Sequence, residues 1–405
     1  MTAIVDSATF RSRLETLERL LWKDGCAGIV EPPRPAEIVD RVLELSDLYT
    51  VERDLIASLP LRRGHLSARV LYFLCADAPK VHLVLDELRS RRAGPHPAPR
   101  RVLDLGAGVG ATAAGLLLSL APGTGPIEII GIDRDGAALQ AWRTVVDRCA
   151  EIAGIEVAAR ALEADLAADA SRSAFGGADL AVAQAVLNET LDGGTAPRVA
   201  PPIAACIAGI AGSMETILIE PALRIATRPL HGLRDDMVAR GIIRVLAPCL
   251  HEGPCPMLTT PRDWCHEVRH WPPTPRVAEI QSLTRRRDDR VRFSFVATSP
   301  RRGESDAAAA PGASAATAEA ADRRGAHAAA RIVSDALASK GKVERWLCCA
   351  DGVLRRVRLL DRERTESNAA IARARRGALL TIEGLPPGGR VDPSVRVAPL
   401  LAAGR

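Results

Sequence analysis

The stretch VLDLGAGVGA, residues 102–111, decides the fold. A short apolar run that contains Asp104 is followed at once by Gly106, Gly108 and Gly110, and then by the apolar helical pattern ATAAGLLLSLA. Glycine lets the chain turn sharply and lets a ligand approach the main chain, while the N-terminus of the next helix attracts negative charge. The stretch therefore predicts a buried strand, a glycine loop and a helix that together bind a nucleotide-like cofactor.

Strand-like and helical segments alternate on the C-terminal side of this loop, which is typical of a doubly wound α/β sheet. Helical patterns such as DGAALQAWRTVVDRCAEIAG separate the short apolar runs. The expected strands are RVLDL (101–105), IEIIGI (127–132), IEVAARAL (155–162), ADLAVAQAVL (178–187), ETILIE (215–220), IIRVLAP (242–248) and VRFSFVAT (291–298).

Two acidic residues at predicted strand ends, Asp104 and Asp133, favour S-adenosylmethionine over NAD as the cofactor. Asp104 lies two residues before the first glycine, where a carboxylate can meet the charged amino group of a methionine moiety but would repel a pyrophosphate. Asp133 ends the second strand and can accept both ribose hydroxyls, a role shared with NAD enzymes. Asp165 follows the third strand and can contact the adenine amino group, or it can simply cap a turn. An NAD-dependent oxidoreductase is disfavoured because Asp104 opposes the pyrophosphate and no hydride-transfer residue is evident.

The chain divides into segments of different character. Residues 1–98 carry apolar residues at helical spacing and predict a helical N-terminal domain. Residues 99–299 contain the alternating pattern, with a cysteine-rich insertion at 247–272. Residues 300–329 are Ala-rich with few large apolar groups and predict a disordered or weakly helical linker. Residues 330–405 return to strand-like patterning and predict a small basic β-rich module, in which ADG makes a hairpin turn.

Composition and charge narrow the class of protein. The 405 residues are 47% hydrophobic, which is ample for a folded core, and the net charge is +5, which is compatible with a nucleic-acid partner. No apolar run approaches the roughly 20 residues that a membrane span needs, and the first residues lack the apolar core of a secretory signal. We therefore expect a soluble cytoplasmic protein, without a membrane partner and monomeric, whose nine cysteines are buried thiols or metal ligands.

The loop after the fourth strand normally faces the methyl group in enzymes that use S-adenosylmethionine, and here it reads AVLNETL (185–191). Asn188 is the candidate to orient a methyl acceptor, although it can equally cap the following turn. The N/D-P-P-Y/F motif of amino-methylating enzymes and the Pro-Cys motif of pyrimidine-C5 methylation are both absent from this loop. The sequence thus indicates a cofactor more clearly than it indicates a reaction.

The segment APCLHEGPCPMLTTPRDWCHE, residues 247–267, contains a third of the cysteines in the chain. The spacing Cys249-x5-Cys255-x9-Cys265 differs from the paired C-x2-C of a zinc ribbon, and prolines stiffen the loop between them. A nearby histidine as fourth ligand would favour zinc, a distant cysteine would suit zinc or an iron–sulfur cluster, and a proline-rich loop with unliganded thiols is the third possibility. The candidate fourth ligands are His251, His266, His270, Cys348 and Cys349.

A run of motifs around this segment resembles one known family. LIEPALRIATRPLHGLRDDMVARGIIRVLAPCLHEGPCPM (218–257) is followed by DWCHEV (263–268) and by FSFVA (293–297), and AVLNE (185–189) precedes them. In this order the motifs are similar to the methyltransferase-like family associated with the small subunit of the mitochondrial ribosome, together with its bacterial relatives. The motifs of the cysteine segment are specific to this family, whereas the similarity over the rest of residues 40–360 is weaker.

This resemblance implies a class I methyltransferase fold, which is Rossmann-like, with a helical N-terminal domain and a β-rich appendage. It also implies a 4Fe–4S cluster held by Cys249, Cys255, Cys265 and a late cysteine, for which Cys348 of LCCADG matches and Cys349 is one place off. The implied partner is small-subunit ribosomal RNA during assembly or translation. Two functions stay open at this point: an S-adenosylmethionine-dependent rRNA methyltransferase, and a non-catalytic assembly factor that uses the methyltransferase fold as an RNA-binding scaffold.

Overall fold

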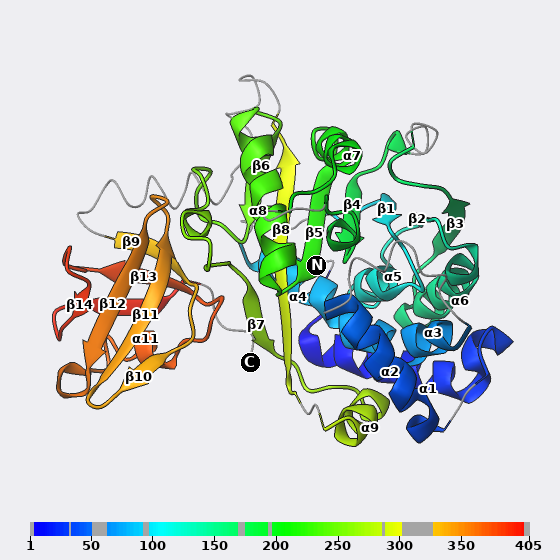
Figure 1. Ribbon diagram of the computed structural model, residues 1–405, viewed down its shortest axis with the longest axis horizontal. Coiled ribbons are helices and arrows are strands. Elements are labelled where there is room, and N and C mark those ends of the chain that lie inside the picture. The colour runs from blue at the N-terminus through cyan, green and yellow to red at the C-terminus, as the bar shows by residue number, and fades with distance from the viewer. Residues whose placement is uncertain are drawn as a thin grey trace.

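The structure is a computed structural model that describes residues 4–31, 34–50, 63–91, 97–168, 175–192, 197–285, 288–301 and 327–400. Most of the expected linker, residues 302–326, lies outside the described residues. Figure 1 shows the C-terminal sheet at the left end of the molecule and the central sheet beside it, with the N-terminal helices below the part of the central sheet that is furthest from the C-terminal sheet.

The central sheet contains all of the strands expected from the sequence. Its strand order is β3-β2-β1-β4-β5-β8-β6, and β7 pairs with β8 beside this path. Strands β1 to β5 are parallel to their neighbours, whereas β8 runs antiparallel to β5, β6 and β7. Within the described residues the strands are β1 (Arg101–Leu105), β2 (Ile127–Asp133), β3 (Val157–Glu163), β4 (Leu180–Gln184), β5 (Glu215–Pro221), β6 (Ile243–Ala247), β7 (Glu267–His270) and β8 (Arg290–Pro300).

Strand β7 corrects the expectation of seven strands. It lies inside the cysteine-rich insertion and pairs with the first part of β8, from Glu267 opposite Phe293 to His270 opposite Arg290. Because β8 is eleven residues long and pairs with β6 only from Ala297 to Pro300, it extends past the end of β6 and leaves unpaired backbone groups on that edge. The pairing with β7 satisfies those groups, so the insertion is attached to the sheet by main-chain hydrogen bonds.

Helices cover both faces of the central sheet, which explains why its strands are nearly continuous apolar runs. One face packs against the N-terminal helices together with α5 and α6, and the other packs against α7 and α8. On β1, Val102 faces the first layer while Leu103 and Leu105 face the second. The helices are α1 (Ser7–Gly28), α2 (Pro35–Thr50), α3 (Arg63–Ala68), α4 (Leu74–Arg91), α5 (Ala111–Leu117), α6 (Gly136–Ala153), α7 (Pro201–Ala211), α8 (Arg224–Ala239) and α9 (Pro275–Leu283).

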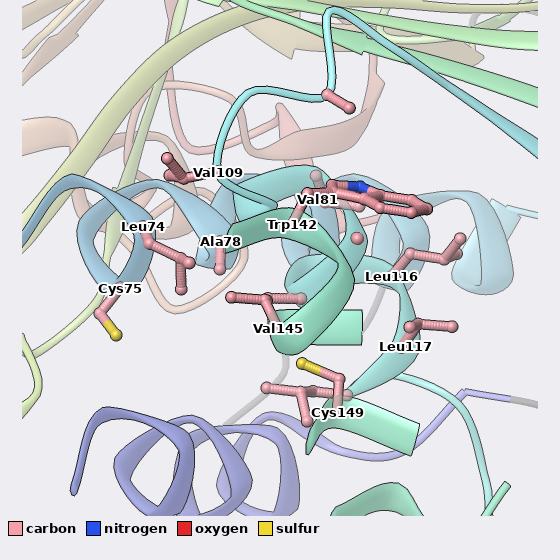
Figure 2. Close-up of a cluster of buried hydrophobic side chains, with 14 of the residues drawn as sticks. Leu74, Cys75, Ala78, Val81, Val109, Leu116, Leu117, Trp142, Val145 and Cys149 are labelled. Atoms are coloured by element: carbon pink, nitrogen blue, oxygen red, sulfur yellow. The ribbon is translucent and has the colours of Figure 1, made fainter. Parts of the chain in front are cut away.

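Helices α4, α5 and α6 meet in one apolar cluster beside the glycine loop. Figure 2 shows side chains of these helices, among them Val81, Leu116 and Trp142, packed together. A Cβ atom added to Gly115 would lie 2.5 Å from the carbonyl oxygen of Ala78, so α4 and α5 approach each other at backbone distance. This contact fixes the N-terminal helices against the helix that follows the glycine loop.

The helical pattern of residues 67–92 is not one α-helix as expected. Helix α3 ends at Ala68, a π-helical segment η2 (Arg69–Phe73) follows, and α4 begins at Leu74. The backbone N–H of Leu74 donates to the carbonyl of Arg69, five residues earlier. Such π-helical turns are rare and occur often at functional sites.

The C-terminal residues form a second sheet of the order β14-β12-β11-β9-β13-β15, with β10 beside β11. The predicted hairpin is present, since β11 pairs antiparallel with β12 across the turn that contains Gly352. Its apolar core is separate from the cores of the central sheet. The strands are β9 (His327–Ile332), β10 (Leu337–Ser339), β11 (Lys342–Cys349), β12 (Leu354–Leu360), β13 (Leu379–Glu383), β14 (Arg390–Val391) and β15 (Arg396–Pro399).

None of the helices in the described part of the chain is long and apolar enough to cross a membrane.

Candidate functional site

The glycine loop lies where the strand order of the central sheet reverses, between β1 and β4. In parallel sheets the crevice outside the carboxyl ends of the strands at such a point is the usual ligand site. Gly106, Gly108 and Gly110 have φ values of +64°, +50° and +102°, which residues with a Cβ adopt rarely. The loop is held against the end of β2, because the N–H of Ala107 donates to the carbonyl of Ile132 at 3.0 Å.

Asp104 is fully buried beneath this loop. Its Oδ2 accepts a hydrogen bond of 2.8 Å from the indole N–H of Trp142 on α6, while its Oδ1 has no partner within the described residues. The pKa of the Asp104 carboxyl is raised to about 7, mainly by burial; the nearby Asp133 carboxylate acts in the same direction, and hydrogen bonding, chiefly by Trp142, opposes it. A buried carboxylate oxygen without a donor is a suitable place for a ligand ammonium group.

Asp133, at the end of β2, holds the glycine loop in place. Its Oδ2 accepts a hydrogen bond of 2.8 Å from the N–H of Gly108, and its Oδ1 accepts one of 2.9 Å from the N–H of Asp135. Both oxygens therefore already accept one backbone hydrogen bond each. A carboxylate has about four lone-pair sites in all, so hydroxyl donors can still be added to this one.

Asp165 lies after β3 on the surface of the protein. Its carboxylate accepts a hydrogen bond of 2.8 Å from the N–H of Ala167, two residues later. This is the geometry of a residue that caps a turn, the alternative that the sequence left open for it.

The loop after β4 lies against the glycine loop. Ala185 has a φ of +59°, and a Cβ atom added to Gly106 would overlap Cγ2 of Val186. Asn188 is buried in a short 3₁₀ segment, Leu187–Glu189. The carboxylate of Glu220, at the end of β5, accepts hydrogen bonds from the N–H groups of Leu187 at 2.8 Å and Asn188 at 3.2 Å. Two parallel strand ends are thus joined by one buried carboxylate.

Sequence reasoning assigned no role to Glu220. The signal is present, because an acidic residue interrupts an otherwise apolar strand immediately before Pro221. A buried carboxylate must find donors, and the neighbouring strand end in a parallel sheet is where backbone N–H groups are available.

The insertion brings three of the predicted ligands close to the C-terminal sheet. Cys255 and Cys265 are buried in a small apolar cluster with Met257 and Val333, and Cys348 packs against this cluster. Burial raises the pKa of Cys255 to about 12, and the neighbouring Cys249 adds to this effect. Burial raises the pKa of Cys265 as well, with further contributions from the charges of Cys255, Cys249 and Cys348.

Cys348 and Cys349 lie on opposite faces of β11, as successive residues of a strand must. Cys348 faces the insertion, where its Sγ is 3.5 Å from Nε2 of His251. Cys349 is 1% exposed and belongs to the apolar core of the C-terminal sheet. The structure therefore places Cys348, and not Cys349, beside the other three cysteines.

The three histidines near the insertion differ in position. His251 is buried and contacts Cys348. His266 stacks on Trp264 with ring centroids 5.6 Å apart. His270 is exposed and lies 3.2 Å from Asp289. Only His251 of these is brought into contact with a predicted cysteine ligand among the described residues.

No three His, Cys, Asp or Glu side chains in the described part of the chain lie close enough together to hold a metal ion. The iron–sulfur site and the zinc site that the sequence leaves open are therefore not shown by the structure. The cysteines are gathered in one region, but not at the spacing of ligands around a single ion.

Helix α8 fixes the insertion through two arginines. Arg228 donates hydrogen bonds to four backbone carbonyls of the insertion, at distances of 2.7–3.1 Å. Arg234 is fully buried and donates to the carbonyls of His251 and Gly253, while Asp235 accepts a hydrogen bond of 2.8 Å from the N–H of Cys255. These bonds hold a loop that has little regular structure of its own.

A single buried arginine of the C-terminal sheet joins that sheet to the rest of the molecule. Arg331 on β9 pairs with Glu87 of α4 and, at 2.7 Å, with Glu267 of β7. Its Nε also donates to the carbonyl of Pro248 at 2.9 Å, one residue before Cys249. The N-terminal helices, the insertion and the C-terminal sheet therefore share one ion network.

Comparison with known proteins identifies relatives of the chain. Residues 67–378 match the family described as mitochondrial small ribosomal subunit Rsm22. No curated protein matches the chain significantly. The family match extends from α3 to the residue before β13, so it includes the glycine loop and all four predicted cysteine ligands.

Solved methyltransferase structures resemble part of the chain. An O-methyltransferase family protein from Burkholderia thailandensis is 17% identical, with 66% of this chain and 73% of that chain covered and a TM-score of 0.31. Mitomycin 7-O-methyltransferase MmcR is 15% identical, with 66% and 68% covered and a TM-score of 0.30. A cyclopropane-fatty-acyl-phospholipid synthase-like protein from Lactobacillus casei is 18% identical, with 48% and 64% covered and a TM-score of 0.25.

Proposed function

The chain belongs to the family described as mitochondrial small ribosomal subunit Rsm22, and from this membership we propose that it binds S-adenosylmethionine and acts on, or binds to, small-subunit ribosomal RNA. The observation that carries the cofactor part is the glycine loop at the reversal of the strand order, with the unpartnered Oδ1 of Asp104 beneath it. The ribosomal part rests on the family match.

The residues of the loop fit the parts of S-adenosylmethionine. Asp104 would meet the amino group, Gly106 and Gly108 would let the ligand approach the main chain, Asp133 would accept the ribose hydroxyls, and Asp165 would contact adenine. The bound cofactor supplies a methyl group on a positively charged sulfur. Asn188, on the loop after β4, would orient the acceptor.

The alternative is that the chain binds RNA without transferring a methyl group. Two observations favour it: the acceptor motifs are absent from residues 185–191, and Val186 lies against Gly106 where a ligand would approach. In that case the methyltransferase fold serves as a scaffold for ribosome assembly.

A transfer assay separates the two functions. Immature small subunits are incubated with the full chain and S-adenosylmethionine that carries tritium in its methyl group, and an Asn188→Ala variant serves as the comparison. An enzyme transfers tritium to RNA, and the variant transfers less. Binding of the cofactor without any transfer would contradict the enzyme and support the scaffold.

We also propose that Cys249, Cys255, Cys265 and Cys348 hold a 4Fe–4S cluster, with zinc as the alternative. The four thiols fit such a group in chemistry, because thiolate is its usual ligand. Burial raises the pKa of Cys249, but Arg234, Arg331 and Arg91 lie near it and oppose this effect, so they favour the thiolate. A four-iron cluster is larger than one ion, so its ligands stand further apart than those of zinc. A cluster held there would link the insertion to the C-terminal sheet.

Metal analysis tests this proposal. Anaerobically purified protein should be brown and should contain iron and inorganic sulfide with little zinc. Colourless protein with one zinc per chain would contradict the cluster and support the alternative.

The division into residues 1–98, 99–299 and 330–405 is likewise proposed, since each part has its own expected pattern. The monomeric state and the cytoplasmic location stay predictions, and the description of the family names the mitochondrion.

A further inference from the structure

We propose that Arg69, which comes from the N-terminal helices, binds the α-carboxylate of the methionine moiety of the cofactor. This inference rests on the proposed cofactor, S-adenosylmethionine, and names the residue that recognises its carboxylate, which is its only negatively charged group. The sequence alone gives no sign of a role for Arg69. The residue lies 35 positions before Asp104, in a segment with the pattern of an ordinary helix.

The position of Arg69 carries the inference. Its Nη1 is 2.8 Å from Oδ2 of Asp135, which follows β2 and caps α6. Its Nη2 would be 3.1 Å from a Cβ atom added to Gly108. A guanidinium group therefore lies directly on the middle glycine of the loop. Any side chain at position 108 would be in close contact with the guanidinium group of Arg69.

The backbone around Arg69 is unusual as well. Arg69 is the first residue of the π-helical segment η2, whose hydrogen bond runs from Leu74 back to Arg69 itself. Contacts between α4 and α5 then hold the segment against the glycine loop. Two independent features, the ion pair and the π-helical turn, thus coincide at one residue.

The charges around the loop are complementary to an amino acid. The free end of S-adenosylmethionine carries an ammonium and a carboxylate on the same carbon. Asp104 offers a carboxylate oxygen without a donor in the described structure, and Arg69 offers a guanidinium. NAD has no such pair of opposite charges, so this arrangement also distinguishes the two cofactors.

The ion pair with Asp135 does not prevent a second acceptor from binding. A guanidinium group has five N–H donors in a planar fork. Arg331 of this chain shows that one guanidinium group can bind several acceptors, because it donates to two carboxylates and two carbonyls at once. Arg69 can therefore stay paired with Asp135 and donate to the ligand carboxylate as well.

The test compares two ligands and several variants by calorimetric titration of the full chain. The ligands are S-adenosylmethionine and its decarboxylated analogue, which lacks only the carboxylate. The variants are Arg69→Gln, Arg69→Lys and the matched control Arg143→Gln, an exposed arginine of α6. Thermal unfolding of each variant shows whether it is folded.

The wild-type chain and the control should prefer S-adenosylmethionine over the analogue by roughly tenfold or more, the range for one charged hydrogen-bonded pair. Arg69→Gln should bind both ligands about equally, and Arg69→Lys should show an intermediate preference because it keeps the charge but loses the fork. An unchanged preference in a folded Arg69→Gln variant would overturn the role of Arg69. If the wild-type chain binds neither ligand, the proposed cofactor itself fails.

Discussion

Asp104 occupies the most demanding position in the proposed site, because its carboxyl group is fully buried and its Oδ2 accepts a hydrogen bond from the indole of Trp142. Its pKa of about 7 means that the folded protein holds the proton more tightly than the unfolded chain, in which the value is near 3.8. This group therefore stabilises the fold fully below about pH 4, and that stability is lost as the pH rises to 7.

We expect unfolding experiments to show this pH-dependent loss of stability. Between pH 5 and pH 8 the wild-type chain should lose on the order of 3 kcal/mol more than an Asp104→Asn variant, because each unit of pKa difference is worth about 1.4 kcal/mol. Urea unfolding of both proteins at the two pH values measures the difference. Equal losses in the two proteins would show that Asp104 does not titrate in this range.

Cofactor binding should also shift the protonation equilibrium of Asp104. An ammonium group beside Asp104 favours the ionised carboxylate, so binding near pH 6 should release a proton. Calorimetry in two buffers with different heats of ionisation measures the number of protons released. Asp104→Asn should release fewer, and equal release in both proteins would contradict the contact.

Gly106 can be tested by adding a single methyl group. In Gly106→Ala the new Cβ would overlap Val186, and the φ of +64° would be strained, so we expect a loss of about 1–3 kcal/mol in the free energy of unfolding. Gly209→Ala is the matched control, because that glycine lies in α7 with nothing within 4 Å of an added Cβ. The control should be neutral or more stable by up to about 1 kcal/mol. A Gly106→Ala variant as stable as the control would show that the two loops are not in contact.

At the scale of elements, β11 decides which of two neighbouring cysteines can serve as a ligand. Strand alternation directs Cys348 to the insertion and Cys349 to the core of the C-terminal sheet. In the cluster proposal, Cys348→Ala should lose most of the iron, whereas Cys349→Ala should keep it. Iron and sulfide analysis of the two variants after anaerobic purification measures this. Loss of iron from Cys349→Ala alone would contradict the assignment.

Most strands of the central sheet could be predicted from the sequence because they are short, buried, apolar runs between glycine or polar turns, whereas β3 at the sheet edge has no buried residue. Strand β7 could not, since EVRH has a single buried residue and becomes a strand only because β8 extends past the end of β6 and pairs with it. The segment RVLYF has the same apolar spacing whether it forms an α-helix or a π-helical turn, so η2 was also missed.

Some residues of the candidate site could likewise be predicted from the sequence, and others could not. The glycine loop, Asp133 and the cysteines are close together in local motifs, so the sequence reveals them. Arg69 and Glu220 contact residues that are 32 to 66 positions away, and one sequence does not show which residues these are. Position in the fold, and not residue type, identifies them.

At the scale of the whole molecule, Arg331 holds three parts together without any cofactor. Its buried guanidinium neutralises Glu87 and Glu267, so its removal leaves two buried carboxylates with one cation fewer. Breaking a buried pair on one side costs about 3–5 kcal/mol. Arg331→Met should therefore unfold at clearly lower urea concentration, whereas Arg358→Ala, an exposed arginine of β12, should differ by less than about 0.5 kcal/mol. Equal midpoints for the two variants would show that the network does not join the parts.

The central claim is that the glycine loop of this member of the Rsm22 family binds S-adenosylmethionine. Equilibrium dialysis of the full, anaerobically purified chain against radiolabelled S-adenosylmethionine tests it most directly, with Asp133→Ala as the comparison. Saturable binding at one site per chain, weakened at least tenfold in a folded Asp133→Ala variant, is the predicted result. No saturable binding by the wild-type chain, or binding that is equal in the two proteins, would contradict the claim.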